Sequence, residues 1–250
     1  MLEWHWLANT NQCHFTLKER RFEMKDCKVQ TKTLAAAMIC GILGCFCYGC
    51  GDWLMMYGDP TYTGKLMWLT SGVAQIPAWR NGLAMMLAFP GIILYGIALF
   101  YLGRFIRDEK EKKIYHYLNA FGLTPWMCLH LFYIMILYLY TWMTGYGYAD
   151  AALPACEALF DHLSWVIIVS EVVMLPVFLY WFYVVVCGKT TLPRWMAAGN
   201  VLVFYCILYV IKSILPDTAF RLGFTNGLMS ESMIFFFILI WIVGSKKSQS

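Results

Sequence analysis

Charged side chains are scarce in this sequence of 250 residues, where Asp, Glu, Lys and Arg together make up 14%. Soluble domains carry roughly a quarter. With 60% hydrophobic residues and a mean hydropathy of +0.58, the scarcity excludes an ordinary soluble domain and predicts an integral membrane protein. The net charge of +4 is too small to indicate a nucleic-acid-binding protein.

Several other features are missing. The first 32 residues are polar and charged, without the apolar run of a cleavable signal peptide. There is no internal repeat, low-complexity tract or phosphate-binding loop. The closely spaced Cys45, Cys47 and Cys50 would face different sides of a helix, and no second cysteine pair follows them. We therefore expect no bound metal, no cofactor and no disulfide framework.

What the sequence does have is apolar segments long enough to cross a bilayer, which takes about 20 residues. Six such segments occur, at 33–57, 83–103, 117–141, 163–187, 195–215 and 222–244. Lipid offers no partners to exposed backbone groups, so each should be a helix. The sequence predicts an all-α transmembrane bundle of about six spans: a polar arm (1–32), one helical domain (33–244) and a short basic tail (245–250).

The positions of Lys and Arg predict the orientation of this bundle. Of the 19 basic residues, 15 fall in the arm, in the segments after the second and fourth spans, and in the tail. Basic segments stay in the cytoplasm, so both termini are expected there, in a protein of the cell membrane. The segment 58–82 reads as an outer loop with a short interfacial helix near 65–74. The segment 142–161, which has no Lys or Arg, reads as a second outer loop.

Ionisable side chains at membrane depth are costly and indicate functional sites. Four of them are candidate acid–base groups, namely Asp52, His130, Glu171 and Glu231. Four further polar residues are candidate ligand contacts, namely Arg80, Lys212, Asn226 and Ser164. Helical spacing places several of these residues on one face of their own span together with neighbours of that span. Asp52 aligns with Tyr48 and Cys45, His130 with Trp126 and Tyr133, and Glu231 with Gly227 and Gly223. We expect these faces to turn inward, around a pocket open to the outer side.

Plainer readings exist for most of these residues. Asp52 is also explained as a helix-end residue, with Arg80 as its partner. His130 is also explained as a core histidine. Lys212 either snorkels to the interface or forms a salt bridge with Glu171 or Glu231. Asp161 and His162 begin the fourth span, where Asp161 is well explained as an N-cap residue. The two glutamates are harder to dismiss, because neither is near enough to a helix end to snorkel.

Two resemblances follow from short motifs. The sequence GDWL at 51–54, followed by PAWR at 77–80, resembles a family of uncharacterised six-helix membrane proteins. That resemblance covers most of the chain and carries no activity, but it implies that Asp52 and Arg80 act as a pair. A weaker likeness is to the membrane lysoplasmalogenases, in which a Gly-Asp and a later acidic residue after Ser resemble Gly51-Asp52 and Ser170-Glu171. That family has more helices and typically Asp at the second position; its likeness implies lipid chemistry.

Three functions fit these observations. The first is a pocket that binds a lipid or small molecule and, in an enzymatic version, hydrolyses it with water; membrane lipids are then the expected partners. The second is a proton-coupled transporter, since intramembrane carboxylates suit proton exchange. The third is a structural or accessory subunit, for which the small residues of the first span, Ala37, Gly41 and Gly44, would be the partner surface.

Overall fold

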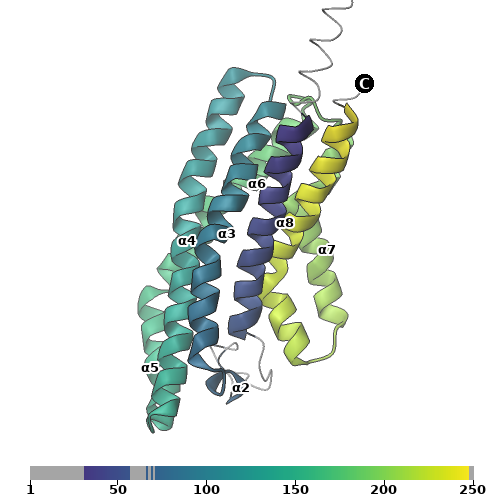
Figure 1. Ribbon diagram of the computed structural model, residues 1–250. Helices are drawn as coiled ribbons and strands as arrows, with labels where there is room; N and C mark the ends of the chain where they lie inside the picture. The colour runs from purple at the N-terminus through teal and green to yellow at the C-terminus, as the bar shows by residue number, and fades with distance from the viewer. Residues whose placement is uncertain (1–30, 57–65, 67–68, 70, 248–250) are drawn as a thin grey trace, which may run out of the picture.

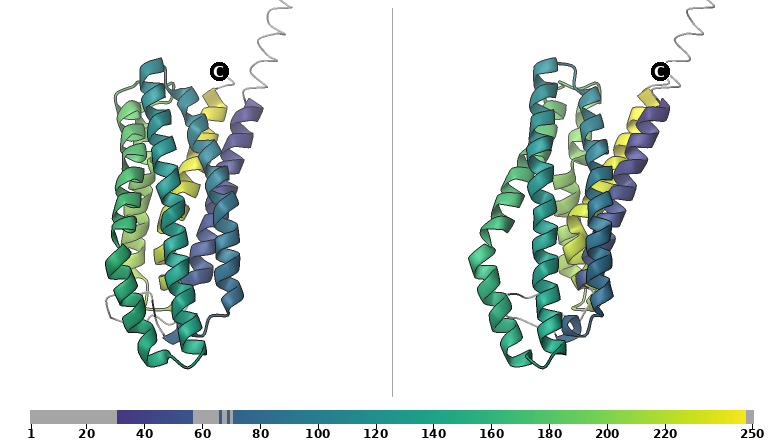
Figure 2. Two further views of the ribbon diagram at one scale, coloured as in Figure 1. Left: turned by 90° about the vertical axis from the view of Figure 1, so that its left-hand side faces the viewer. Right: turned by 60° about the vertical axis from the view of Figure 1, so that its left-hand side comes forward.

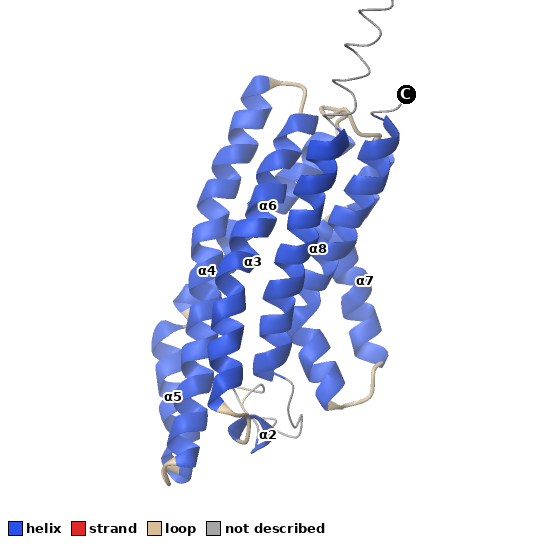
Figure 3. Cartoon of the chain, viewed as in Figure 1, coloured by secondary structure: helices blue, strands red, loops and turns tan. Residues whose placement is uncertain are grey.

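The computed structural model describes residues 31–56, 66, 69 and 71–247. Within this part of the chain the secondary structure is helical, without a named strand (Figure 3). The helices are Thr31–Met56, α2 (Ser71–Ala74), α3 (Ala78–Leu102), η1 (Gly103–Phe105), α4 (Glu109–Gly145), α5 (Ala149–Leu163), α6 (Trp165–Val186), η2 (Arg194–Gly199), α7 (Val201–Ile214) and α8 (Ala219–Lys247).

The long helices run side by side along one axis (Figures 1 and 2). Helix Thr31–Met56 begins at the end of the bundle where α8 finishes, and α2 lies at the opposite end. α4 packs against α3, α5 and α6, while α7 packs along α8. We call the end that holds the start of helix Thr31–Met56 and the end of α8 the basic end, and the opposite one the α2 end.

Among the described residues, five helices are long and apolar enough to cross a membrane: Thr31–Met56, Ala78–Phe105, Glu109–Gly145, Trp165–Val186 and Ala219–Lys246. The sixth expected segment, 195–215, is instead a 3-10 turn followed by the short apolar helix α7. The two parts are separated at Asn200, whose backbone is extended and whose side chain caps α7 by accepting the N–H of Leu202 at 2.9 Å. The sequence pattern showed the apolar run but not this break.

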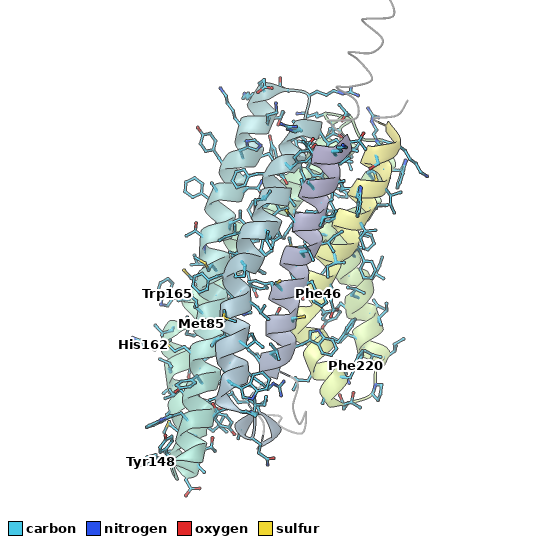
Figure 4. All side chains as sticks on the ribbon, viewed as in Figure 1. Phe46, Met85, Tyr148, His162, Trp165 and Phe220 are labelled. Atoms are coloured by element: carbon cyan, nitrogen blue, oxygen red, sulfur yellow. The ribbon has the colours of Figure 1, made fainter. Side chains whose placement is uncertain are left out.

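The outer surface of the bundle is apolar, as a lipid-facing surface must be. Large hydrophobic side chains such as Phe46, Trp165 and Phe220 project from its sides with 60%, 60% and 50% of their surface exposed (Figure 4). Together with the five long helices, this surface suits an integral membrane protein.

The prediction of an outer loop at 142–161 is wrong. α4 continues to Gly145, the chain turns at Gly147 with φ of +88°, and α5 then returns along α4. Ala152 and Cys156 are fully buried in this contact, and the Cys156 thiol approaches the carbonyl of Ile136 at 3.7 Å. The absence of Lys and Arg, which suggested a loop, therefore did not distinguish a loop from a helix that packs on its neighbour. Of the helix expected near 65–74, the structure describes α2 and two further residues, and the remainder lies outside the described residues.

Helix Thr31–Met56 and α3 pack backbone to backbone. A Cβ atom added at Gly44 would lie 2.4 Å from the backbone nitrogen of Tyr95 and 2.6 Å from the carbonyl oxygen of Gly91. Neither backbone atom can move aside, so glycine is needed at this crossing. The small residues of the first span therefore contact α3 of the same chain.

Two loops are joined at the basic end. Ile106 and Thr190 form an isolated antiparallel bridge, and the backbone N–H of Arg107 donates to the carbonyl of Lys189 at 2.9 Å. Asp108 caps α4 by accepting the N–H groups of Lys110 and Glu111 at 2.9 and 3.0 Å. These contacts explain why α4 begins at Glu109, ahead of the apolar run at 117: the first two turns extend beyond the expected span as a capped, charged helix.

Candidate functional site

A hollow of about 500 Å³ lies in the half of the bundle nearer α2. Its walls come from the end of helix Thr31–Met56 and from α4, α6, α7 and α8. The side chains that give it chemical character are two carboxylates, one imidazole, four phenol or indole rings, an amide and two hydroxyls: Asp52, Glu171, His130, Tyr48, Trp126, Tyr133, Tyr205, Asn226, Thr225 and Ser230. Neither Lys nor Arg is among its lining residues.

Asp52 and His130 form the centre of the hollow. Asp52 Oδ1 lies 3.5 Å from His130 Nδ1, and the two side chains are 14% and 3% exposed. The Tyr48 ring packs against the imidazole at a tilt of 51° with centroids 4.3 Å apart, and its hydroxyl donates to the carbonyl of Trp126 at 3.2 Å. The carboxylate therefore faces a fixed ring, so the imidazole cannot turn freely.

The other edge of His130 is held by close packing of backbone. A Cβ atom at Gly51 would lie 3.2 Å from His130 Nε2 and 3.2 Å from the carbonyl oxygen of Ala84. Glycine before Asp52 thus lets helix Thr31–Met56, α3 and α4 meet around the imidazole. The Gly-Asp pair of the sequence has a structural reason: Gly51 makes room for the ring that Asp52 faces.

Glu231 is held beside this pair rather than in the wall of the hollow. Its Oε1 accepts the indole N–H of Trp53 at 3.1 Å, and its Oε2 is buried without a hydrogen-bond partner. The Trp53 ring in turn packs edge-on against Phe220, with centroids 5.2 Å apart. Trp53 belongs to the GDWL motif, but no sequence pattern predicted its bond to Glu231, which is 178 residues further along the chain.

Glu171 lines the hollow from α6 but is itself exposed at the side of the bundle. The adjacent lining residues Val172 and Leu175 are also exposed, with 61% and 44% of their surface accessible. Across the hollow stands Tyr205 of α7. The hollow therefore reaches the exposed side of the bundle at α6.

Of the predicted ligand contacts, one lies in the hollow. Asn226 lines it, and its Nδ2 donates to the carbonyl of Leu222 one turn earlier at 2.8 Å, leaving Oδ1 toward other groups. Ser164 is not among the lining residues, because it sits at the junction of α5 and α6, where its hydroxyl donates to the carbonyl of Asp161 at 3.4 Å.

The two predicted basic contacts also lie elsewhere. Arg80 Nη2 donates to the backbone carbonyl of Trp53 at 3.4 Å, one residue beyond Asp52, and the pairing of Arg80 with the Asp52 carboxylate is not found. Lys212 places its Nζ 4.8 Å from the centre of the Tyr209 ring and forms no salt bridge with Glu171 or Glu231. Its carbon chain is long enough to carry the ammonium away from α6 and α8 to the end of α7.

The described residues contain no group of three or more His, Cys, Asp or Glu side chains placed to hold a metal ion. Cys45 is buried, whereas Cys47 and Cys50 are partly exposed, so the three thiols do not converge. The ionisable groups of the hollow can instead form hydrogen bonds and ion pairs with a ligand.

Comparisons with known proteins give one result. Neither the curated proteins nor the solved structures include a match to this chain. A family model does match it, over residues 24–247, which includes every residue of the hollow. The chain belongs to this family, which is described as a family of unknown function (DUF6796).

Proposed function

We propose that this protein is a multi-pass membrane protein whose hollow binds a cationic ligand, an amine or quaternary ammonium group carried by a lipid or a small molecule. The observation that carries the proposal is the lining itself. Asp52 and Glu171 bring two carboxylates to a hollow that neither Lys nor Arg lines, and Arg80 and Lys212 point elsewhere. A cation would supply the charge that these carboxylates lack.

The rings of the hollow support the same ligand class. Tyr48, Trp126, Tyr133 and Tyr205 line it together with Phe178. Aromatic faces attract ammonium groups, more strongly where water is excluded, and cages of such rings recognise quaternary ammonium ions. Carboxylates and rings in one hollow therefore favour an organic cation over a hydrated metal ion.

The exposed side of the hollow at α6 supports a lipid as the carrier of that cation. The exposed lining residues Val172 and Leu175 are apolar, whereas Asp52 and His130 lie deeper. A lipid entering sideways would leave its chains along α6 and bring its headgroup to Asp52. In this proposal the chain crosses the membrane six times with both termini cytoplasmic, and α7 is the shortest span.

Hydrolysis is the enzymatic form of the proposal. His130 Nε2 is packed against Gly51, and its Nδ1 faces Asp52. In this form Asp52, which lines the hollow, would be the general base that activates a water molecule, and His130, held by Tyr48, would orient its carboxylate. The likeness of Gly51-Asp52 and Ser170-Glu171 to the lysoplasmalogenases points the same way, although Ser170 bonds to the carbonyls of Val166 and Pro125 and so acts between helices.

Binding is measured on the purified full chain in neutral detergent, with lysophosphatidylcholine as the lipid that carries a quaternary ammonium group and lysophosphatidylglycerol as the anionic lipid that lacks one. We expect the choline lipid to bind, and Asp52→Asn and Glu171→Gln each to weaken it about tenfold or more, because each removes one charged contact. Asp150→Asn is the matched control: it removes an exposed carboxylate of α5 outside the hollow. Equal affinity for the two lipids, or full affinity in the Asp52→Asn, Glu171→Gln double variant, would refute the proposal.

Proton-coupled transport is the second candidate, because Asp52, His130 and the unpartnered Glu231 Oε2 form a chain of titratable groups. Uptake of radiolabelled choline into proteoliposomes, with and without a pH gradient, tests it. Gradient-dependent uptake that Glu231→Gln abolishes supports transport, whereas retention without flux leaves binding or hydrolysis as the function.

A further inference from the structure

A second hollow, of about 600 Å³, lies at the basic end. Three separate parts of the chain bring a cation to it: Arg107 from the loop before α4, Arg194 from the start of η2, and Lys246 from the end of α8. All three are exposed, while Thr190 and Leu192 beneath them are buried. No acidic residue is among those that line this hollow.

The acids closest in sequence are already engaged. Asp108, next to Arg107, accepts two backbone N–H groups at the start of α4. Glu111 is bonded to Lys189 and to the Tyr180 hydroxyl. None of the three cations forms an ion pair among the described residues. Within the part of the chain that the structure describes, their positive charge is therefore not neutralised.

Arg194 is also positioned by the backbone. Gly188 ends α6 with φ of +67°, the N–H groups of Gly188 and Lys189 turning back to the carbonyls of Val185 and Val184 at 3.0 and 2.9 Å. A Cβ atom at Gly188 would lie 2.9 Å from Arg194 Nε. The guanidinium thus lies directly on this turn, and the turn needs glycine both for its φ and for the guanidinium.

We propose that this basic hollow is a binding site for a phosphate group, presented by an anionic lipid headgroup or by a soluble phosphate compound. Two guanidinium groups offer forked N–H donors that match phosphate oxygens in pairs, and the ammonium of Lys246 adds a point charge. Basic pockets next to membrane-crossing helices bind phospholipid headgroups in this way. The site is distinct from the hollow near α2 that Asp52 and Glu171 line, which we call the acidic hollow. Its test does not depend on the proposed function.

Two probes distinguish the sources of phosphate: dioctanoyl phosphatidic acid and inorganic phosphate, each titrated into the full chain in neutral detergent while the unfolding temperature is followed. We expect phosphatidic acid to stabilise the protein, less so as salt is raised. The Arg107→Gln, Arg194→Gln double variant should weaken its apparent affinity tenfold or more. Stabilisation by phosphatidic acid alone assigns the site to lipid, and equal stabilisation by both probes assigns it to a soluble phosphate compound.

Arg104→Gln is the matched control, since this exposed arginine of the same end lies over the Tyr101 ring, 5.1 Å from its centre, and outside the hollow. It should bind as the unmodified chain does. Should the double variant fail to fold, Lys246→Gln replaces it, with an expected loss of about threefold to tenfold. The proposal is overturned if neither probe stabilises the protein, or if Arg104→Gln reduces affinity as much as the hollow variants do.

Discussion

The two ends of the bundle differ in whether their buried and half-buried carboxylates have a cationic partner. At the basic end Glu111 meets Lys189 and Tyr180, so acid and base neutralise each other. Nearer α2, Asp52 in the acidic hollow lies against a histidine, and Glu231 beside the hollow accepts an indole N–H. Among the described residues no lysine or arginine pairs with either carboxylate. Paired charges of this kind stabilise a fold, whereas carboxylates left without a cation indicate a place kept for one.

The same contrast holds for the two hollows, which carry charge of opposite sign. Carboxylates and rings line the hollow near α2, and arginine and lysine line the hollow at the basic end. Ligands of opposite charge are expected at the two ends. One molecule of zwitterionic lipid is too short to reach both, so the hollows are separate sites.

The largest effect is expected from disrupting the backbone contact between helix Thr31–Met56 and α3, two helices that run from one end of the bundle to the other. In Gly44→Ala the new methyl group would press on the backbone of α3, and we expect the free energy of unfolding to fall by about 3 kcal/mol. Gly82→Ala is the control, because no atom lies within 4 Å of the added Cβ at this exposed position of α3. It should stabilise the helix by about 0.5–1 kcal/mol. Thermal unfolding in detergent measures both, and similar values for the two variants would contradict the backbone contact.

A second variant sharpens the account of the basic end. Gly188→Ala places a side chain at positive φ and against Arg194, and we expect a loss of stability of about 1–2 kcal/mol together with weaker binding of phosphatidic acid. Gly147→Ala has the same backbone strain at φ of +88° but open space around the Cβ. It should lose stability without losing lipid affinity. Equal lipid affinity in both variants would mean that Arg194 does not contact phosphate.

A third pair of variants compares the ends directly. Glu111→Gln should lower the unfolding temperature, because it removes the charged partner of Lys189 and Tyr180. The bond to Glu111 also raises the pKa of Lys189, which shows that the pair favours the charged lysine. Asp52→Asn should leave the unfolding temperature unchanged or raise it, while weakening binding of the choline lipid about tenfold or more. The comparison fails if Asp52→Asn is the more destabilising of the two.

The smallest effect is expected at Trp53. Trp53→Phe keeps an aromatic ring beside Phe220 and removes the indole N–H that Glu231 accepts. We expect the free energy of unfolding to fall by about 1 kcal/mol, the ordinary contribution of one hydrogen bond. Tyr146→Phe, which alters an exposed ring in the turn after α4, is the control. A change no larger than that of the control would show that the indole does not hold Glu231.

Hydropathy was sufficient to predict the helical class and the approximate position of the long spans, because each span needs an apolar run whatever its neighbours are. It was not sufficient for α5. Ala152 and Cys156 are small and weakly apolar, and Pro154 lies inside the helix, so the segment resembles a loop until its contact with α4 is known. The break at Asn200 could not be predicted either. One polar residue in an apolar run does not show whether its amide caps a new helix or lies within a continuous one.

For the acidic hollow, helical spacing identified the faces that carry Asp52, His130, Glu171 and Asn226, and these residues do line one hollow. Spacing could not tell which basic groups would reach them. Arg80 and Lys212 have long side chains whose direction depends on contacts far away in sequence, with the Trp53 carbonyl and the Tyr209 ring. Sequence periodicity predicts the face of a helix on which a residue lies, but not the position of the charged group at the end of a long, flexible side chain.

The short helix α7 has a consequence for the bilayer itself. Its 14 residues extend about 21 Å, against a hydrocarbon thickness of about 30 Å. The turn between α7 and α8 accordingly lies higher in the view of Figure 1 than the turn between α4 and α5. Lipids beside α7 must thin or tilt to match it, while those beside α4 need not. The protein would therefore sit in a wedge-shaped annulus, thinnest at α7, which lines the acidic hollow, and lipid headgroups there would start closer to Asp52 than the average membrane allows.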